Sequence, residues 1–369
     1  MNQNLLKKYS YPQQHNIFEF RIYLEYQVSI QIGFFYPLNK NKFKLNKEEN
    51  YIYNIVPHKA VSLIKEWENI INYKYNDKGE LVNKKTLKKS QKLDPQEYEL
   101  VGTYVQHYVE DYLIRKYNLE KLYVPNNNIS PDFSKRDKEQ AQCKILITKD
   151  FYSNPKCLIL IQGSGSVKLG QWSRSVCINE NLNLGTMGPY IEKAQRNNLS
   201  VIILNPNERH DFFNESKIIK EFDTMQKHCL YVYNNIIKVN KHIKEIYIVA
   251  HSKGGECAIE LLINNKEDLI NRRIKKIAFT DSSHGYEYFK LGNDGLKIFW
   301  LISRDYVTST KPIGIFLKSH KDTTKGVNLF SSGHNRHEYT SGYAIKEIFK
   351  FFFEETNSKK INSVKPKNK

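Results

Sequence analysis

The most informative stretch of this 369-residue sequence is Ile246-Tyr247-Ile248-Val249-Ala250-His251-Ser252-Lys253-Gly254-Gly255. Its apolar, β-favouring first half predicts a buried strand. Apolar residues at helical spacing, from Cys257 to Leu262, predict a helix directly behind it. Ser252 lies at the turn between the two. Small residues flank this turn because a sharp turn strains the backbone and brings the helix close to the strand.

A serine between a strand and a helix is typical of the nucleophile elbow of α/β-hydrolases, which is usually written G-x-S-x-G. Ala250 stands at the first glycine position of that pattern. A serine acts as a nucleophile only with a base, an acid that orients the base, and donors that stabilise the oxyanion. These partners have to come from other parts of the chain.

The acid and the base follow the serine in the chain order that α/β-hydrolases use, Ser-Asp-His. Asp281 directly ends the next predicted strand, Ile274 to Thr280, and open sheets place their sites at such strand ends. His337 precedes the last predicted helix and is the expected base. The alternatives are His334 and His284 as bases and Glu338 and Asp305 as acids.

A Gly-Ser-Gly loop, Gly163-Ser164-Gly165, follows an earlier predicted strand, Cys157 to Gln162. Its glycines allow backbone amides to approach a substrate, so this loop and the Lys253 amide are expected to form the oxyanion hole. A loop of this composition could instead bind phosphate. The G-K-[ST] continuation of a P-loop is missing, however, which makes that alternative poor.

Strands and helices alternate from Lys144 onward, which predicts a doubly wound, mostly parallel sheet of the α/β-hydrolase-like class. Strand patterns at residues 16–37 and helical patterns after them predict an α+β extension at the N-terminus. The predicted order is the N-terminal extension over 1–125, a linker over 126–138, the α/β domain over 139–356 and a basic, disordered tail over 357–369.

Two helices have the clearest patterns. One opens at Asp94-Pro95, where Asp94 is a candidate cap and proline is tolerated in the first turn. Its tyrosines and valines recur every three or four residues, which favours a core-facing surface over a base-stacking platform. The other is predicted as one long amphipathic helix from Ile218 to Ile237.

The formal net charge is +18, from 57 Lys and Arg against 39 Asp and Glu. Such a surplus favours polyanionic partners, so contact with RNA through a basic surface is one expectation. The alternative is a codon bias that enriches lysine together with asparagine, isoleucine and tyrosine. The basic segment from Asn83 to Lys92 is open to the same two kinds of interpretation. It is either a nucleic-acid or localisation patch or a solvated loop.

Five scattered cysteines, without a C-x-x-C pair, argue against a disulfide framework or a zinc site and fit a reducing compartment. No metal or cofactor is expected. The first residues, Met1 to Tyr11, lack the apolar core of a signal peptide. The best apolar run, Val28 to Pro37, is too short to span a membrane. A soluble protein of the nucleus or cytoplasm is therefore expected.

Three blocks of the sequence share their motifs with one known family. They are Leu158 to Gly165 with Gly170-Gln171-Trp172 and Ile178 to Thr186, Val201 to Glu208, and Val249 to Gly255 with Thr280-Asp281-Ser282 and Arg336-His337-Glu338. On these residues the chain resembles the argonaute-binding-protein-two domain proteins, over about residues 70–355. The Gly-Gln-Trp and Asn-Glu segments are the specific part, because simple esterases do not share them.

The resemblance implies an α/β-hydrolase-like domain used in nuclear regulation: small-RNA silencing, heterochromatin formation and cotranscriptional control. It implies argonaute and chromatin or silencing proteins as partners. The family's serine that matches Ser252 is a candidate nucleophile without an agreed substrate. Two residues depart from the family pattern. Gln162 replaces a histidine, and Lys253 stands where relatives often have tyrosine, which makes the mouth of the elbow more cationic.

Two functions are therefore weighed. The first is an interaction module that holds argonaute or chromatin proteins. The second is a serine hydrolase that acts on an ester, thioester or amide through Ser252, His337 and Asp281. A third interpretation keeps the triad as structure only, with its polar groups satisfying one another. The fold by itself does not choose among them.

Overall fold

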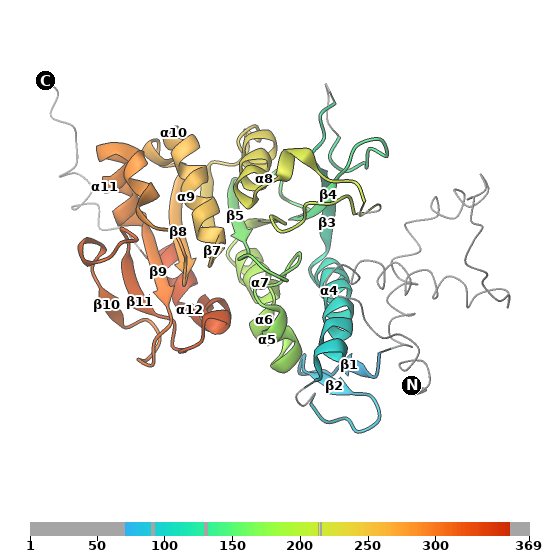
Figure 1. Ribbon diagram of the computed structural model, residues 1–369. Coiled ribbons are helices and arrows are strands. Elements are labelled where there is room, and N and C mark those ends of the chain that lie inside the picture. Colours follow the sequence, from blue (N-terminus) through green and yellow to red (C-terminus); the bar gives the residue numbers. More distant parts are fainter. Residues whose placement is uncertain (1–70, 90–92, 129–131, 213, 215, 355–369) are drawn as a thin grey trace, which may run out of the picture. The chain divides into compact units, whose positions relative to one another are not determined.

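A nine-stranded sheet forms the centre of the chain (Figure 1), with the strand order β10-β11-β9-β8-β7-β5-β6-β4-β3. This computed structural model describes residues 71–89, 93–128, 132–212, 214 and 216–354. The strands are β3 Leu119–Val124, β4 Cys143–Thr148, β5 Lys156–Ile161, β6 Ser200–Ile203, β7 Glu245–His251, β8 Ile274–Thr280, β9 Ser303–Val307, β10 Phe316–Lys318 and β11 Asn328–Ser331. The run from β11 to β6 is parallel throughout, which confirms the predicted doubly wound, mostly parallel sheet.

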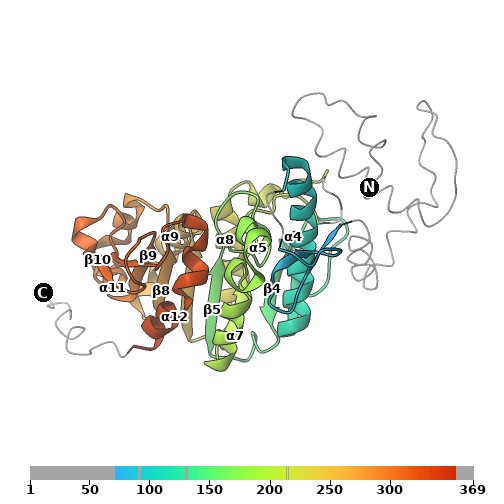
Figure 2. The ribbon, with the colours of Figure 1, turned by 90° about the horizontal axis from the view of Figure 1, so that it is seen from below.

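Helices cover both faces of this sheet, as α/β sheets require. Figures 1 and 2 place α8, α9 and α11 on one face and α7 and α12 on the other. The helices are α4 Pro95–Tyr117, α5 Arg174–Asn179, α6 Leu182–Gly185, α7 Gly188–Arg196, α8 Met225–Val232, α9 Gly254–Asn264, α10 Lys266–Ile270, α11 Gly292–Ile302 and α12 Thr340–Phe353. Between these layers, β5 and β7 are apolar and buried on both faces and form the middle of the core.

The helix predicted at Asp94-Pro95 is confirmed as α4. The Asp94 side chain accepts hydrogen bonds from the amides of Gln96 and Glu97, at 2.9 Å each, so it caps the first turn. The helix ends at Asn118, which takes the left-handed conformation that closes many helices. Its three valines and two of its tyrosines, Tyr104 and Tyr117, are buried, as expected for a core-facing surface.

The helix predicted from Ile218 to Ile237 is wrong in its first part. The helix α8 begins only at Met225, because the Thr224 side chain accepts a hydrogen bond from Lys227 N and caps it there. Before the cap, Ile218 forms an isolated β-bridge with His210. After Val232 the helix widens into a π-helical turn over Tyr233–Ile237.

The main sheet includes a strand from the segment predicted as the N-terminal extension. Strand β3 pairs along its whole length with β4, which lies beyond the predicted linker. A separate hairpin of β1 (Tyr73–Tyr75) and β2 (Leu81–Asn83) precedes α4. Two compact units divide between Ile70 and Ile71, and all described residues belong to the second. The predicted strands at 16–37 and the basic tail at 357–369 lie outside the described residues.

No helix in the described part of the chain combines the length and apolar character that crossing a membrane requires. All five cysteines are described, and each is a buried free thiol.

Candidate active site

Ser252 and Asp281 lie side by side at the carboxyl ends of two neighbouring strands. His251, the last residue of β7, pairs with Thr280, the last residue of β8. Ser252 and Asp281 directly follow them. Both have left-handed backbones, with φ of 51° and 48°. A left-handed backbone is strained for a residue other than glycine, and it is the conformation that turns a strand sharply into an elbow.

Asp281 and His337 form a hydrogen-bonded pair. His337 Nδ1 lies 2.7 Å from Asp281 Oδ2 and donates to it, and Thr308 N approaches the other carboxylate oxygen at 3.4 Å. His337 begins the short helical turn that leads into α12, so the base comes from the loop after β11. Its side chain is 48% exposed, and no hydrogen bond between described residues uses its Nε2.

The pair is stabilised electrostatically in its charged form. The hydrogen bond to Asp281 raises the pKa of His337 above its ordinary 6.5 despite partial burial. Burial acts to raise the pKa of Asp281, but the hydrogen bond and charge of His337 outweigh it and hold that pKa below 3.8. This is the arrangement in which a carboxylate orients an imidazole and stabilises its protonated state.

The competing acids and bases are engaged elsewhere. The ring of His284 is buried, with hydrogen bonds to Ser282 and to the Lys325 carbonyl. The ring of His334 stacks on Tyr339 with centroids 4.2 Å apart. The fallback acids are held by cations: Asp305 by Lys325, and Glu338 by Arg336. Of the predicted alternatives, the structure joins only Asp281 with His337.

Ser252 Oγ makes no hydrogen bond within the described part of the chain, although its backbone is firmly held. Ser252 N donates to Thr280 O, and Ser252 O accepts from Ser283 N, both at 3.1 Å. The His251 ring packs beside His337, with centroids 4.7 Å apart, and burial lowers its pKa to about 4. A neutral His251 therefore lines the site next to the expected base, a neighbour that sequence reasoning missed.

The predicted oxyanion loop passes directly over the elbow. A Cβ added to Gly163 would lie 2.9 Å from Ser252 Cβ, so only glycine allows this approach. Ser164, Gly165 and Lys253 are exposed, and no hydrogen bond between described residues uses their backbone amides. Free amides beside a serine are the donors that an oxyanion hole requires. The catalytic roles of Ser252, Asp281, His337 and these amides remain predictions.

Sequence reasoning missed the residue that holds this loop in place. Asn207 follows β6 and donates from Nδ2 to Gly163 O at 2.7 Å and to Val167 O at 2.9 Å. Gln162 adds a second donor to Val167 O, at 3.1 Å. The available signal was the block from Val201 to Glu208, which contains Asn207, but the loop that Asn207 holds is 40 and 44 residues distant in sequence.

Replacing Asn207 by alanine is expected to loosen the oxyanion loop. Two hydrogen bonds are lost, so we expect the free energy of unfolding to fall by about 1–2 kcal/mol. Amide hydrogen exchange should accelerate over residues 163–167 and stay unchanged in β8, measured by mass spectrometry. The control is Asn264→Ala, because the Asn264 amide bonds only within its own helix, to Glu260. Unchanged exchange in the loop of the Asn207 variant would contradict the claim that Asn207 holds this loop in place.

The Asp281–His337 pair predicts a pH window for stability. A raised histidine pKa stabilises the fold below about pH 6.5, and a lowered carboxylate pKa does so above about pH 4. The difference in unfolding free energy between wild type and His337→Gln should therefore be largest between these values. It should shrink as pH rises through the raised pKa of His337 and as pH falls through the lowered pKa of Asp281. Urea unfolding of both proteins at a series of pH values measures this difference. A difference that does not change with pH would show that the Asp281–His337 pair does not stabilise the fold.

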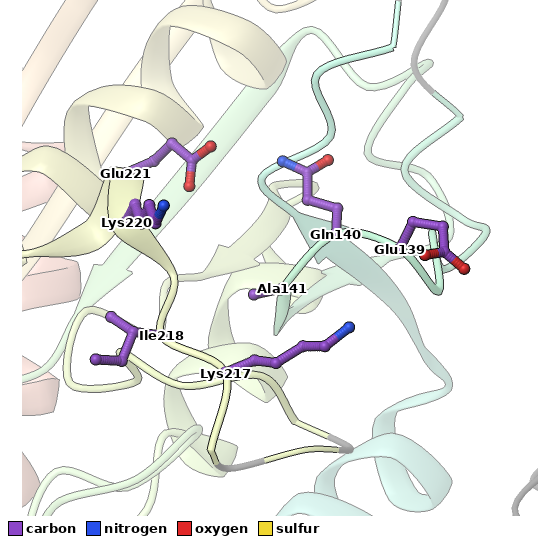
Figure 3. Close-up of a pocket in the computed structure, with 7 residues that line it drawn as sticks. All are labelled: Glu139, Gln140, Ala141, Lys217, Ile218, Lys220 and Glu221. Carbon is purple, nitrogen blue, oxygen red and sulfur yellow. The ribbon is translucent and has the colours of Figure 1, made fainter. Parts of the chain in front are cut away.

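A separate hollow lies beside the start of β4 (Figure 3). It has a volume of about 400 Å³ and is lined by Glu139, Gln140, Ala141, Lys217, Ile218, Lys220 and Glu221. The first three residues lie just before β4, and the other four lie between β6 and α8. None belongs to the predicted triad. Among the described residues no cluster of three or more His, Cys, Asp or Glu side chains is placed to hold a metal ion.

Comparison with known proteins gives a family and named relatives. The model of the Arb2 domain matches residues 53–313. The cotranscriptional regulator ARB2A homolog of Dictyostelium discoideum is 33% identical over 331 residues, which cover 80% of this chain and 80% of that protein. The human cotranscriptional regulator ARB2A is 27% identical over 354 residues, covering 80% and 81%.

Solved structures add only a remote likeness. A histone deacetylase from Saccharomyces cerevisiae aligns with a TM-score of 0.42 and 11% identity, over 70% of this chain and 98% of that chain. A likeness at that level carries no argument about activity. The family match, in contrast, spans most of the chain and includes Ser252 and Asp281. The chain therefore belongs to the Arb2 domain family.

Proposed function

We propose that this chain is an interaction module in cotranscriptional gene regulation. Family membership supports the proposal, together with relatives that are named cotranscriptional regulators and align over four-fifths of both chains. On this proposal the hydrolase-like domain acts in the nucleus and holds argonaute and chromatin proteins in small-RNA silencing and heterochromatin formation. The net charge of +18 would assist contact with RNA.

Affinity purification of the endogenous protein at near-physiological salt tests this module. Recovery of argonaute or chromatin proteins supports it, and a purification that recovers neither contradicts it. RNA contact, where present, is expected to be weak and to fall steeply with salt, because charge is its main source.

The second candidate is a serine hydrolase, and the Asp281–His337 hydrogen bond favours it. Ser252 Oγ would attack the acyl carbon of an ester, thioester or amide while His337 Nε2 takes the hydroxyl proton. The amides of Ser164, Gly165 and Lys253 would stabilise the oxyanion. The same proton would then pass to the leaving group, and water would release the acyl group from Ser252.

Ser252 Oγ and His337 Nε2 form no hydrogen bond among the described residues. This chemistry requires one, and such bonds often tighten only when substrate binds. A fluorophosphonate, which reacts with activated serines, tests the candidate: labelling that needs Ser252 supports it. Rescue of a null strain by Ser252→Ala separates the two functions. Full restoration of silencing by this variant favours the interaction module. A variant that is present at the normal protein level but does not restore silencing favours the serine hydrolase.

A further inference from the structure

Four residues behind Asp281, of which Ser282, His284 and Asp305 are buried and Lys325 is partly exposed, close a ring of hydrogen bonds, which we call the Ser282 cycle. Ser282 Oγ lies 2.6 Å from His284 Nδ1, and His284 Nε2 lies 2.9 Å from Lys325 O. Lys325 Nζ donates to Asp305 Oδ2 at 2.8 Å, and Ser282 N approaches Asp305 Oδ1 at 3.4 Å, which returns to the start. The cycle joins the end of β8, strand β9 and the loop before β11.

The protonation states within the cycle are consistent with one another. His284 Nε2 faces a carbonyl, so it carries the proton, and Nδ1 accepts from the Ser282 hydroxyl. Burial lowers the pKa of His284 and keeps the ring neutral. Asp305 is fully buried and its charge is balanced by Lys325, so the whole cycle is neutral.

The cycle also touches the elbow. Ser282 Oγ occupies the space that a Cβ on Gly255 would need, so it packs against the first turn of α9. The next residue, Ser283, donates its backbone amide to Ser252 O at 3.1 Å. Asp281 thus lies between two held segments, the elbow on one side and the cycle on the other.

We propose that the Ser282 cycle is a positioning device that holds the Asp281 carboxylate against His337. Asp281 has a left-handed backbone, and among the described residues the one hydrogen bond that its carboxylate accepts besides that of His337 comes from Thr308 N at 3.4 Å. Its orientation therefore depends on the fixed backbone of residues 282–284, which the cycle anchors. The expected effect of the cycle on the labelling rate of Ser252 rests on the proposed hydrolase function. Its expected effect on the pKa of His337 rests on the geometry alone.

The test is the pKa of His337, measured by NMR titration of ring-labelled histidine in the full chain. His284→Ala opens the cycle without changing any charge, because His284 is neutral. If the cycle holds Asp281, this variant lowers the pKa of His337 toward 6.5, since the hydrogen bond to Asp281 is what raises it. The other charged or titratable groups that face His337 are Glu338, Lys325 and His251. Lys325 belongs to the cycle, but its cation lowers the pKa of His337, so its movement away would raise that pKa rather than lower it.

His228→Ala is the matched control, because His228 is also buried and neutral but accepts a hydrogen bond from Asn205 N, outside the cycle. Both variants are expected to lose stability, and only the cycle variant should shift the pKa of His337. Ser282→Ala, which removes one oxygen, repeats the test where His284→Ala fails to fold.

Fluorophosphonate labelling of Ser252 should slow by roughly tenfold or more in the cycle variants, because the base is misoriented. A pKa of His337 that stays at its wild-type value in both cycle variants overturns the inference. A lowered pKa in a protein whose wild type is never labelled supports the positioning role and contradicts the hydrolase proposal, so the two failures are distinguishable.

Discussion

Ser252→Ala is expected to slow fluorophosphonate labelling by roughly 10³-fold or more, because loss of the nucleophile removes the chemistry of a triad almost completely. Stability should change little. The Ser252 hydroxyl has no hydrogen-bond partner among the described residues, and alanine takes the same backbone conformation with one atom fewer. The measurements are the labelling rate by intact-protein mass spectrometry and the thermal midpoint by calorimetry.

Ser283→Ala is the matched control for this experiment. Ser283 lies in the neighbouring loop and is exposed, and its hydroxyl bonds to Glu256 rather than to any member of the triad. We expect its labelling rate to equal that of wild type. His337→Gln should slow labelling strongly, because glutamine cannot take up the serine proton. Equal labelling of wild type and Ser252→Ala would show that the probe reacts elsewhere and would exclude the serine hydrolase.

Gly254→Ala is expected to lower the free energy of unfolding by about 2–3 kcal/mol. An added Cβ would lie 2.6 Å from Gln162 O and 2.7 Å from Ile161 O, which are backbone atoms at the end of β5. Backbone carbonyls cannot rotate away as side chains do. The helix α9 must therefore move off the sheet, and the Ser252 turn at its start must move with it. Urea unfolding of the two proteins measures the loss.

Gly285→Ala is the control for this substitution. The nearest atom to its added Cβ is Glu287 Oε2 at 3.3 Å, at the end of an exposed side chain that can move. Its free energy of unfolding should stay within about 0.5 kcal/mol of the wild-type value. Equal losses in the two variants would contradict the claim that close packing of α9 on β5 sets the position of the elbow.

The part of the site that could be predicted from sequence is the part encoded locally. The elbow shows as a change from strand to helix periodicity across Ser252, and Asp281 shows as the polar residue that ends an apolar run. Chain order predicted a base just before the last helix but did not separate His337 from His334, because both lie there; the hydrogen bond of His337 to Asp281 makes that choice. The cap of α4 was visible for the same reason, since Asp94 bonds amides two and three residues away.

The rest depends on contacts between distant segments. Apart from the Ser282–His284 pair, the hydrogen bonds of Asn207 to the oxyanion loop and those of the Ser282 cycle join residues 20 to 44 positions apart, and no short-range pattern marks such pairs. The long helix predicted at Ile218 was wrong because an apolar periodicity continued across Thr224, whose side chain starts a new helix. Strand β3 was assigned to an extension because its pairing with β4 crosses a loop-like segment.

The left-handed backbone of Ser252 has a consequence for the balance between stability and activity. A non-glycine residue in this conformation costs about 1 kcal/mol or more relative to glycine, which adopts it freely. A domain selected for folding alone would gain that stability by placing glycine at position 252. This chain instead has a hydroxyl at a strained strand end, as in proteins that trade stability for activity. The strain is a stability cost that can be measured with neither a substrate nor a partner.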